Sequence, residues 1–313
     1  MQESFLTSVR IVVPMALLMA LGALIRRSGI IDRPTMRQLD RLLFRVFMPT
    51  LLFKNIYEMD ISRGLSFGLM LFVGTSLLGL GLVALTVPRR ITGDSAKAAS
   101  IGQALVRSNY ILFGLAIAES LYGEGNVGIV ALLGAFTIPI MNALAVIVME
   151  TALAGRARLG PIAVSILKNP MIIATSIAFV LMALPYPFPP LLWGVVRDVA
   201  GVTTPLSFIS LGVGLDLGKA RADLRPLTLG VLLRTVLVPS IFLPLSVMLG
   251  YSGPTLCALL ILFGAPTAVA SYPMAVAMGA DGPLAGQLVC ATTLLSIPTI
   301  FLATFALLSL GLL

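Results

Sequence analysis

Residues 235–280 form a run of 46 positions without a charged side chain. A cluster of turn-forming residues at 250–254, Gly-Tyr-Ser-Gly-Pro, interrupts the run. About 20 apolar residues suffice for a helix to cross the hydrocarbon core of a bilayer, so the run predicts two membrane helices joined by a tight turn. Charged residues make up only 11% of the chain, against about 25% in soluble domains. That is too little charge to cover a water-exposed surface, and the chain is predicted to lie in a membrane.

The same criteria predict ten membrane helices in an all-α polytopic protein. Two of them, 35–57 and 97–120, carry polar or charged residues inside. The pair Asn169-Pro170 predicts a capped helix start, with Asn as N-cap and Pro as the first helical residue. The ten predicted helices are 5–26, 35–57, 64–88, 97–120, 126–149, 161–184, 190–215, 226–249, 254–279 and 283–312.

Basic residues gather in alternate loops. The loops that follow the first, third, fifth and seventh predicted helices carry 14 of the 21 Lys and Arg residues, and the opposite face carries four. Because Lys and Arg are enriched in cytoplasmic loops, we expect these loops in the cytoplasm and both termini outside it, in the cell (inner) membrane. The net charge of +8 then follows from topology and requires no nucleic-acid partner.

Several common signatures of bond chemistry are missing from the sequence. There is no histidine, and the two cysteines, Cys257 and Cys290, lie in apolar runs typical of core residues. Neither a phosphate-binding Gly-x-x-x-x-Gly-Lys-Ser/Thr loop nor a Gly-x-Ser-x-Gly nucleophile turn is present. We therefore expect no catalytic residue and no metal site. A carrier is the favoured class, and a passive channel, a non-transporting membrane sensor or, less favoured, an intramembrane enzyme are the alternatives.

The two halves of the chain share features at an offset of about 156 positions. The matched positions are Pro14 with Pro170, Pro49 with Pro205, and Asn109 with Pro266. A duplicated five-helix unit enters the membrane from the opposite side, because five is odd. We therefore predict two inverted repeats, 1–155 and 156–313, an arrangement common in secondary transporters.

The fourth and ninth predicted helices are interrupted at corresponding places, residues 107–110 and residues 264–267. Pro266 has no backbone N–H to donate, and the Asn109 amide competes for backbone groups. Broken helices that cross in mid-membrane bring the positive ends of half-helix dipoles together, where they suit a carboxylate. The sequence thus predicts an anion site at this crossing.

At these residues the chain resembles the auxin efflux carrier family, within the bile acid/sodium symporter-like superfamily. Its relatives include plant auxin carriers and bacterial permeases proposed for malate and malonate. The similar segments are residues 41–53 (RLLFRVFMPTLLF), 109–116 (NYILFGLA), 168–170 (KNP), 265–267 (APT) and 279–281 (GAD). The chain departs from the family pattern at Ala116, where proline is frequent, and after Ala277, where a basic residue is frequent.

The resemblance implies a sodium/proton-antiporter-like fold in which helices 4 and 9 cross. It also implies a scaffold of helices 1, 2, 6 and 7, usually a dimer interface, and a transport domain of helices 3–5 and 8–10 that moves against it like an elevator. The expected substrates are small organic anions such as malonate, malate or auxin-like acids. The expected partners are this anion, the lipid bilayer and a second copy of the chain.

Ten residues are predicted to bind the substrate. Asn142 is an amide in an otherwise apolar helix, where an unpaired polar group costs about 4 kcal/mol or more; a hydrogen bond between helices is its alternative role. Arg107 and Arg234 carry charges that cost about 2.5–3.5 kcal/mol to bury, and an arginine fork fits a carboxylate; snorkelling or ion pairing is their alternative. The predicted set is Asn109, Asn142, Pro266, Thr267, Ser108, Tyr110, Met48, Leu52, Arg107 and Arg234.

The sequence does not select one coupling ion. The acidic residues weighed for this role, Glu119, Glu124, Glu150, Asp198, Asp216 and Asp281, fall near helix ends. No acidic pair stands in the middle of a predicted helix, so proton coupling through a carboxylate is not expected. Sodium coupling, proton coupling by another route and uniport remain as alternatives, and no cofactor is expected.

Overall fold

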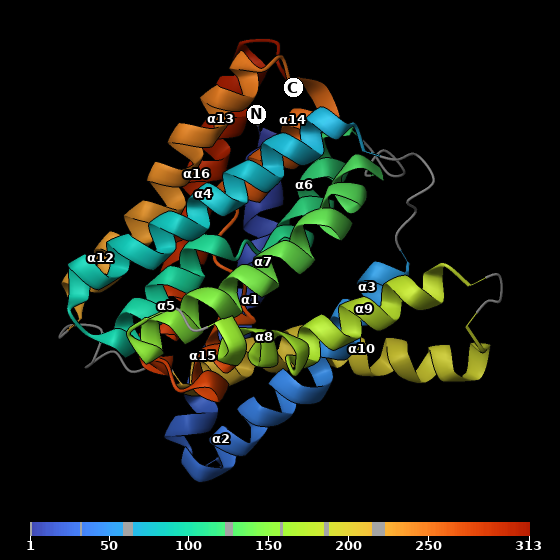
Figure 1. Cartoon of the computed structure of the whole chain (residues 1–313). Coiled ribbons are helices and arrows are strands. Elements are labelled where there is room, and N and C mark those ends of the chain that lie inside the picture. The colour runs from blue at the N-terminus through green and yellow to red at the C-terminus, as the bar shows by residue number, and fades with distance from the viewer. Residues whose placement is uncertain are drawn as a thin grey trace.

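The computed structural model describes residues 2–31, 33–58, 65–122, 128–156, 159–184, 188–214 and 223–313. All regular elements within these ranges are helices (Figure 1). In chain order they are α1 (Gln2–Arg27), α2 (Arg33–Leu42), the π-helical turn η1 (Leu43–Phe47), α3 (Met48–Tyr57), α4 (Phe67–Thr92), α5 (Ser95–Val106), α6 (Tyr110–Tyr122), α7 (Gly128–Ala154), α8 (Leu159–Leu167), α9 (Pro170–Met182), α10 (Pro190–Gly214), α12 (Leu224–Leu232), the π-helical turn η2 (Leu233–Leu237), α13 (Val238–Met248), α14 (Gly253–Gly264), α15 (Ser271–Met278) and α16 (Gly282–Ser309).

Within the described residues each of the ten predicted ranges is largely helical, but several are divided. The predicted helix 161–184 is split into α8 and α9, which meet at an angle of 59°. Asn169 caps the start of α9, because its side chain accepts hydrogen bonds from the backbone N–H groups of Met171 (2.9 Å) and Ile172 (3.4 Å). Pro170 follows as the first helical residue. The predicted cap is thereby confirmed, and the bend is an addition to the prediction.

Four helical stretches in the described part of the chain are long and apolar enough to cross a membrane. They are α4, α7, the continuous α12–η2–α13 and α16. The bent pair α8 and α9 makes a fifth if it counts as one span. A polytopic all-helical protein agrees with this finding, and the crossing of the membrane by all ten predicted helices stays a prediction.

The helices pack in two groups (Figure 1). In one group α3 packs against both α9 and α10, and α1 runs along α10. Glycines allow this last contact: a Cβ on Gly212 would lie 2.0 Å from the Met19 carbonyl oxygen, and a Cβ on Gly22 would lie 2.1 Å from that of Ile209. The other group contains α4, α5, α7, α12 to α14 and α16.

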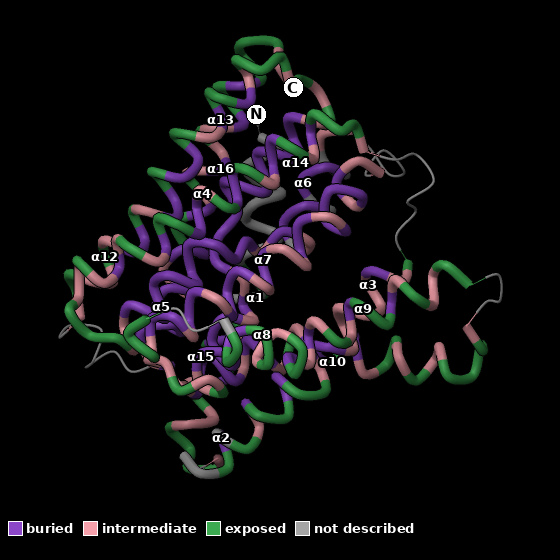
Figure 2. The backbone as a smooth tube through the Cα atoms, viewed as in Figure 1, coloured by how far each residue is buried: buried purple, intermediate pink, exposed green. Residues whose placement is uncertain are grey.

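The second group holds the most deeply buried helices of the molecule (Figure 2). Every residue from Ala98 to Val106 in α5, and every residue from Leu256 to Gly264 in α14, is buried. These two short helices therefore lie in the protein interior and not against lipid. Their inner ends lie where the two predicted helix breaks occur.

Candidate substrate site

Two extended segments cross at the centre of the molecule. The first, residues 107–109, joins α5 to α6. The second, residues 265–270, joins α14 to α15 and ends in a turn at Val269 and Ala270. They run antiparallel with a bridge between Ser108 and Thr267. The Asn109 N–H donates to the Pro266 carbonyl (2.8 Å), and the Ala268 N–H donates to the Arg107 carbonyl (3.1 Å). Both predicted breaks are thus confirmed, and the second one is longer than predicted.

Arg234 caps the two helices that end at this crossing. Its Nε and Nη2 atoms donate to the Ala265 carbonyl (3.1 and 2.7 Å), and Nη2 also donates to that of Leu262 (3.2 Å). Its Nη1 atom donates to the carbonyl of Leu105 in α5 (3.2 Å). A cation at the C-terminal ends of two helices is favourable because these ends carry partial negative charge. Arg234 lies outside the cavity lining, and its guanidinium is engaged by carbonyls, so this geometry does not favour the predicted substrate contact.

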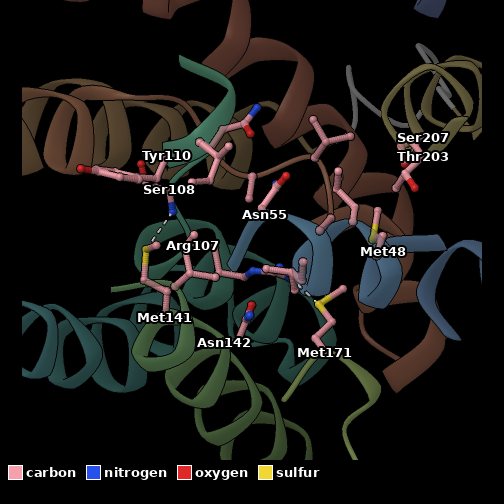
Figure 3. A pocket seen from close by; sticks show the side chains of 18 of the residues that line it. Met48, Asn55, Arg107, Ser108, Tyr110, Met141, Asn142, Met171, Thr203 and Ser207 are labelled. Carbon is pink, nitrogen blue, oxygen red and sulfur yellow. Dashed lines mark hydrogen bonds between the residues drawn. The ribbon is translucent and has the colours of Figure 1, made fainter. Parts of the chain in front are cut away.

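Beside the crossing lies a cavity of ≈ 540 Å³. Its wall is formed by α3, both extended segments, the start of α6, α7, α9 and α10. The cavity therefore lies between the two groups of helices. Seven predicted site residues line it, namely Met48, Leu52, Arg107, Ser108, Asn109, Tyr110 and Asn142 (Figure 3).

Arg107 supplies a buried positive charge to this wall, with 5% of its surface exposed. Its Nη1 atom lies 2.9 Å from the Met274 sulfur. Its Nη2 atom lies 3.6 Å from the Met171 sulfur (Figure 3). Thioethers are weak acceptors. The ion pairs found among the described residues join Lys54 to Glu58 and Lys97 to Asp223, so no described carboxylate neutralises Arg107.

Two amides add hydrogen-bond donors to the same wall. The side-chain nitrogens of Asn109 and Asn142 are buried and have no hydrogen-bond partner in the described part of the protein. Asn142, on α7, is only 3% exposed. Since buried polar groups are normally paired, a polar ligand in the cavity would supply the hydrogen-bond acceptors that both amides lack.

Other predicted site residues brace the crossing. The Ser108 hydroxyl donates to the Ile261 carbonyl (3.3 Å), and its N–H donates to the Met141 sulfur (3.4 Å; Figure 3). The Thr267 hydroxyl donates to the Ala104 carbonyl (3.1 Å), and its N–H donates to the Thr292 hydroxyl (3.1 Å). Neither Thr267 nor Pro266 lines the cavity. Their observed contacts position the extended segments that carry Arg107 and Asn109.

Several residues of the cavity wall were not predicted from the sequence. Asn55 follows Met48 and Leu52 at spacings of seven and three, which place the three residues on one helix face, so this signal could have identified it. Ser207 could not be identified from the sequence, because a serine can satisfy its hydroxyl within its own helix. In the structure the Ser207 hydroxyl donates to the Thr203 carbonyl (2.6 Å). The missed wall residues are Leu51, Asn55, Ile111, Ile138, Met141, Met171, Thr203, Thr204, Ser207, Ala268, Val269 and Ala270.

Comparison with known proteins assigns the chain to a family. The profile of the family described as "Membrane transport protein" matches residues 7–157 and 156–304. The chain belongs to this family, the auxin efflux carriers. It is also 23% identical over 303 residues to a protein of Methanothermobacter thermautotrophicus described as an uncharacterized transporter, and the match covers 94% of this chain and 96% of that relative. This member of the auxin efflux carrier family is therefore a membrane transport protein and not an enzyme.

Proposed function

We propose that this auxin efflux carrier family member is a secondary transporter of small organic anions, and that it binds them in the cavity beside the crossing. The observation that carries the proposal is the buried guanidinium of Arg107, which no carboxylate among the described residues neutralises. A buried unpaired charge is unfavourable. A carboxylate ligand would supply the missing counter-charge.

The neighbouring amides favour the same class of ligand. The side-chain nitrogens of Asn109 and Asn142 are donors, and a carboxylate offers acceptors only. An arginine fork binds a carboxylate through two parallel hydrogen bonds. Malonate, malate and auxin-like acids all meet this requirement, so the proposal names the class and not one acid.

The position of the cavity supports alternating access by an elevator movement. Residues from α3, α9 and α10 form one side of it, and residues of the crossing and α7 form the other. These sides correspond to the scaffold and the transport domain expected from the family resemblance. A sliding movement of one group along the other would carry a bound anion between the two faces of the membrane.

The inverted repeat and the topology belong to the same proposal. The two profile matches meet at residues 156–157, which supports a division near the middle of the chain. Figure 1 draws both termini at one end of the molecule, which supports an even number of crossings. A homodimer through the scaffold is proposed from the exposed apolar side chains of α10, among them Leu191, Leu192 and Val195.

Ligand-dependent thermal unfolding of the purified protein tests the binding site. A ligand that binds the folded state stabilises it by RT ln(1 + [L]/Kd), so millimolar malonate or malate should raise the melting temperature. We expect Arg107→Gln to abolish this rise. The exposed Arg197→Gln on α10 is the matched control and should keep it. The absence of any rise with carboxylates in the folded wild-type protein would overturn the anion assignment.

A further inference from the structure

A buried carboxylate lies where the two groups of helices meet, close to the candidate site. Asp40 is on α2, and 1% of its surface is exposed. It accepts a hydrogen bond from the Ser210 hydroxyl of α10. Its other oxygen accepts one from the Tyr272 hydroxyl of α15 (3.3 Å). Asp40 was not predicted as a functional residue, because it stands in a polar, arginine-rich segment of the sequence.

The two donors come from helices that the proposed mechanism assigns to different moving parts. In the proposed mechanism α2 and α10 are part of the scaffold, whereas α15 is the half-helix that follows the second extended segment. Tyr272 comes two residues after Ala270 of the cavity wall, and Met274 of the same half-helix contacts Arg107. Tyr272 therefore links the scaffold to the helix that carries part of the candidate anion site.

Tyr272 packs closely against two glycines, one in α10 and one in α16. A Cβ on Gly214 of α10 would lie 2.2 Å from the Tyr272 hydroxyl oxygen, and a Cβ on Gly286 of α16 would lie 3.3 Å from the ring. The hydroxyl thus reaches Asp40 only because α10 carries glycine at this position. A movement of α15 past α2, which carries Asp40, would separate the two residues.

Few other charges act on this carboxylate among the described residues. From α15 the facing titratable group is Tyr272 itself, and from α10 the facing group is the non-titrating Ser210 hydroxyl. Arg26, near the end of α1, acts electrostatically on the Tyr272 hydroxyl. Arg41 of α2 and Arg45 of η1 are exposed. The two hydroxyl donors are therefore the main groups that favour the charged carboxylate.

We infer that Asp40 is a proton-binding site whose occupancy is coupled to the movement of α15 past the scaffold. Hydrogen bonds to a carboxylate favour its charged form, and burial favours its neutral form. When α15 moves away, Asp40 loses one of its two donors and stays buried, so it binds a proton. By linkage, acid favours the moved state. A proton would then be taken up or released in step with the transport cycle, which rests on the proposed function.

The test is a distance measurement in the full chain. Spin labels are placed at Arg41→Cys on α2 and Ala277→Cys on α15, two exposed positions, in a Cys257→Ala and Cys290→Ala background. In nanodiscs we expect the population of the moved state to rise about tenfold between pH 8 and pH 5.5. Asp40→Asn should give one and the same distance distribution at both pH values. The exposed Asp198→Asn on α10 is the control and should retain the pH response.

A second variant protects the test from a folding failure. Tyr272→Phe removes the donor and keeps the ring, and it should also lose most of the pH response. A pH response that persists in Asp40→Asn and in Tyr272→Phe, or a wild-type protein without one, would overturn the inference. Counterflow of labelled malonate in liposomes at equal pH on both sides is measured in parallel. Its absence would refute anion transport alone, because the distance measurement needs no substrate.

Discussion

The backbone N–H of Asn109 donates a hydrogen bond to the carbonyl of Pro266, at 2.8 Å, across 157 positions of sequence. The two residues interrupt two different helices, and each supplies the hydrogen-bond partner that the other would lack. Pro266 has a free carbonyl because it lies in an extended segment, and Asn109 has a free N–H because α6 begins only at Tyr110. This pairing exposes donors beside a cavity in the middle of an otherwise apolar protein.

Two replacements of Arg107 should separate the effect of its charge from the effect of its forked shape on anion binding. Arg107→Lys keeps the charge but loses the fork that binds a carboxylate in two places, whereas Arg107→Gln loses both. We expect malonate affinity to fall about tenfold in the lysine variant and about a hundredfold in the glutamine variant. Isothermal titration of the purified proteins measures both. Equal affinities in the wild type and Arg107→Gln would show that the guanidinium does not contact the anion.

Loss of Arg234 should act on stability. Arg234→Gln leaves several carbonyls of α5 and α14 unsatisfied in a fully buried place, and hydrogen bonds to a charged group contribute about 1.5–3 kcal/mol each. We expect a large decrease in melting temperature, measured by tryptophan fluorescence in detergent. Arg197→Gln, at an exposed position, should unfold like the wild type. An Arg234→Gln protein of unchanged stability that no longer binds anions would restore the predicted substrate contact.

The approach of α1 to α10 predicts a sharp contrast between two glycines of one helix. Gly212→Ala would place a Cβ 2.0 Å from the Met19 carbonyl oxygen, and we expect overpacking to cost about 1–3 kcal/mol. Gly201→Ala meets nothing within 4 Å and should be neutral or stabilising, because alanine favours helix over glycine. Thermal unfolding of the two variants side by side measures the contrast. Equal stability of both would refute close contact between these helices.

The Asn142 amide should contribute to binding more than to folding. Asn142→Ala removes a buried donor that has no partner among the described residues, so little stability is lost, whereas a bound carboxylate would lose one hydrogen bond. We expect a decrease in malonate affinity of about tenfold with the melting temperature of the ligand-free protein nearly unchanged. A strongly destabilised variant would favour the alternative role in a hydrogen bond between helices.

Much of the helical framework was predictable from the sequence. Charge-free runs define helices, and the residue types of a break, such as Asn109 and Pro266, are visible because they disfavour helix. The bend at Asn169 and the turns η1 and η2 were not predicted. A bend angle and a π-helical turn depend on packing between helices. Charge-free runs and helix-breaking residues do not describe that packing.

Many residues of the site could be predicted from the sequence, but their individual roles could not. Arg107 and Arg234 are both single arginines in apolar surroundings, and their sequence patterns do not separate them. In the structure Arg107 lies on an extended segment beside the cavity, and Arg234 lies on η2, from which it reaches the ends of α5 and α14. Asp40 was missed for a related reason: its burial arises from α10 and α15, which are distant in sequence.

Counterflow in proteoliposomes tests whether the protein carries anions through this cavity. Vesicles loaded with unlabelled malonate are diluted into labelled malonate, and uptake is followed for the wild type and for Arg107→Gln, with Arg197→Gln as control. We expect a transient, saturable accumulation of label in the wild type and the control and none in Arg107→Gln. Accumulation in Arg107→Gln equal to that of the wild type, or a non-saturable flux without overshoot, would contradict an anion carrier that acts through this cavity.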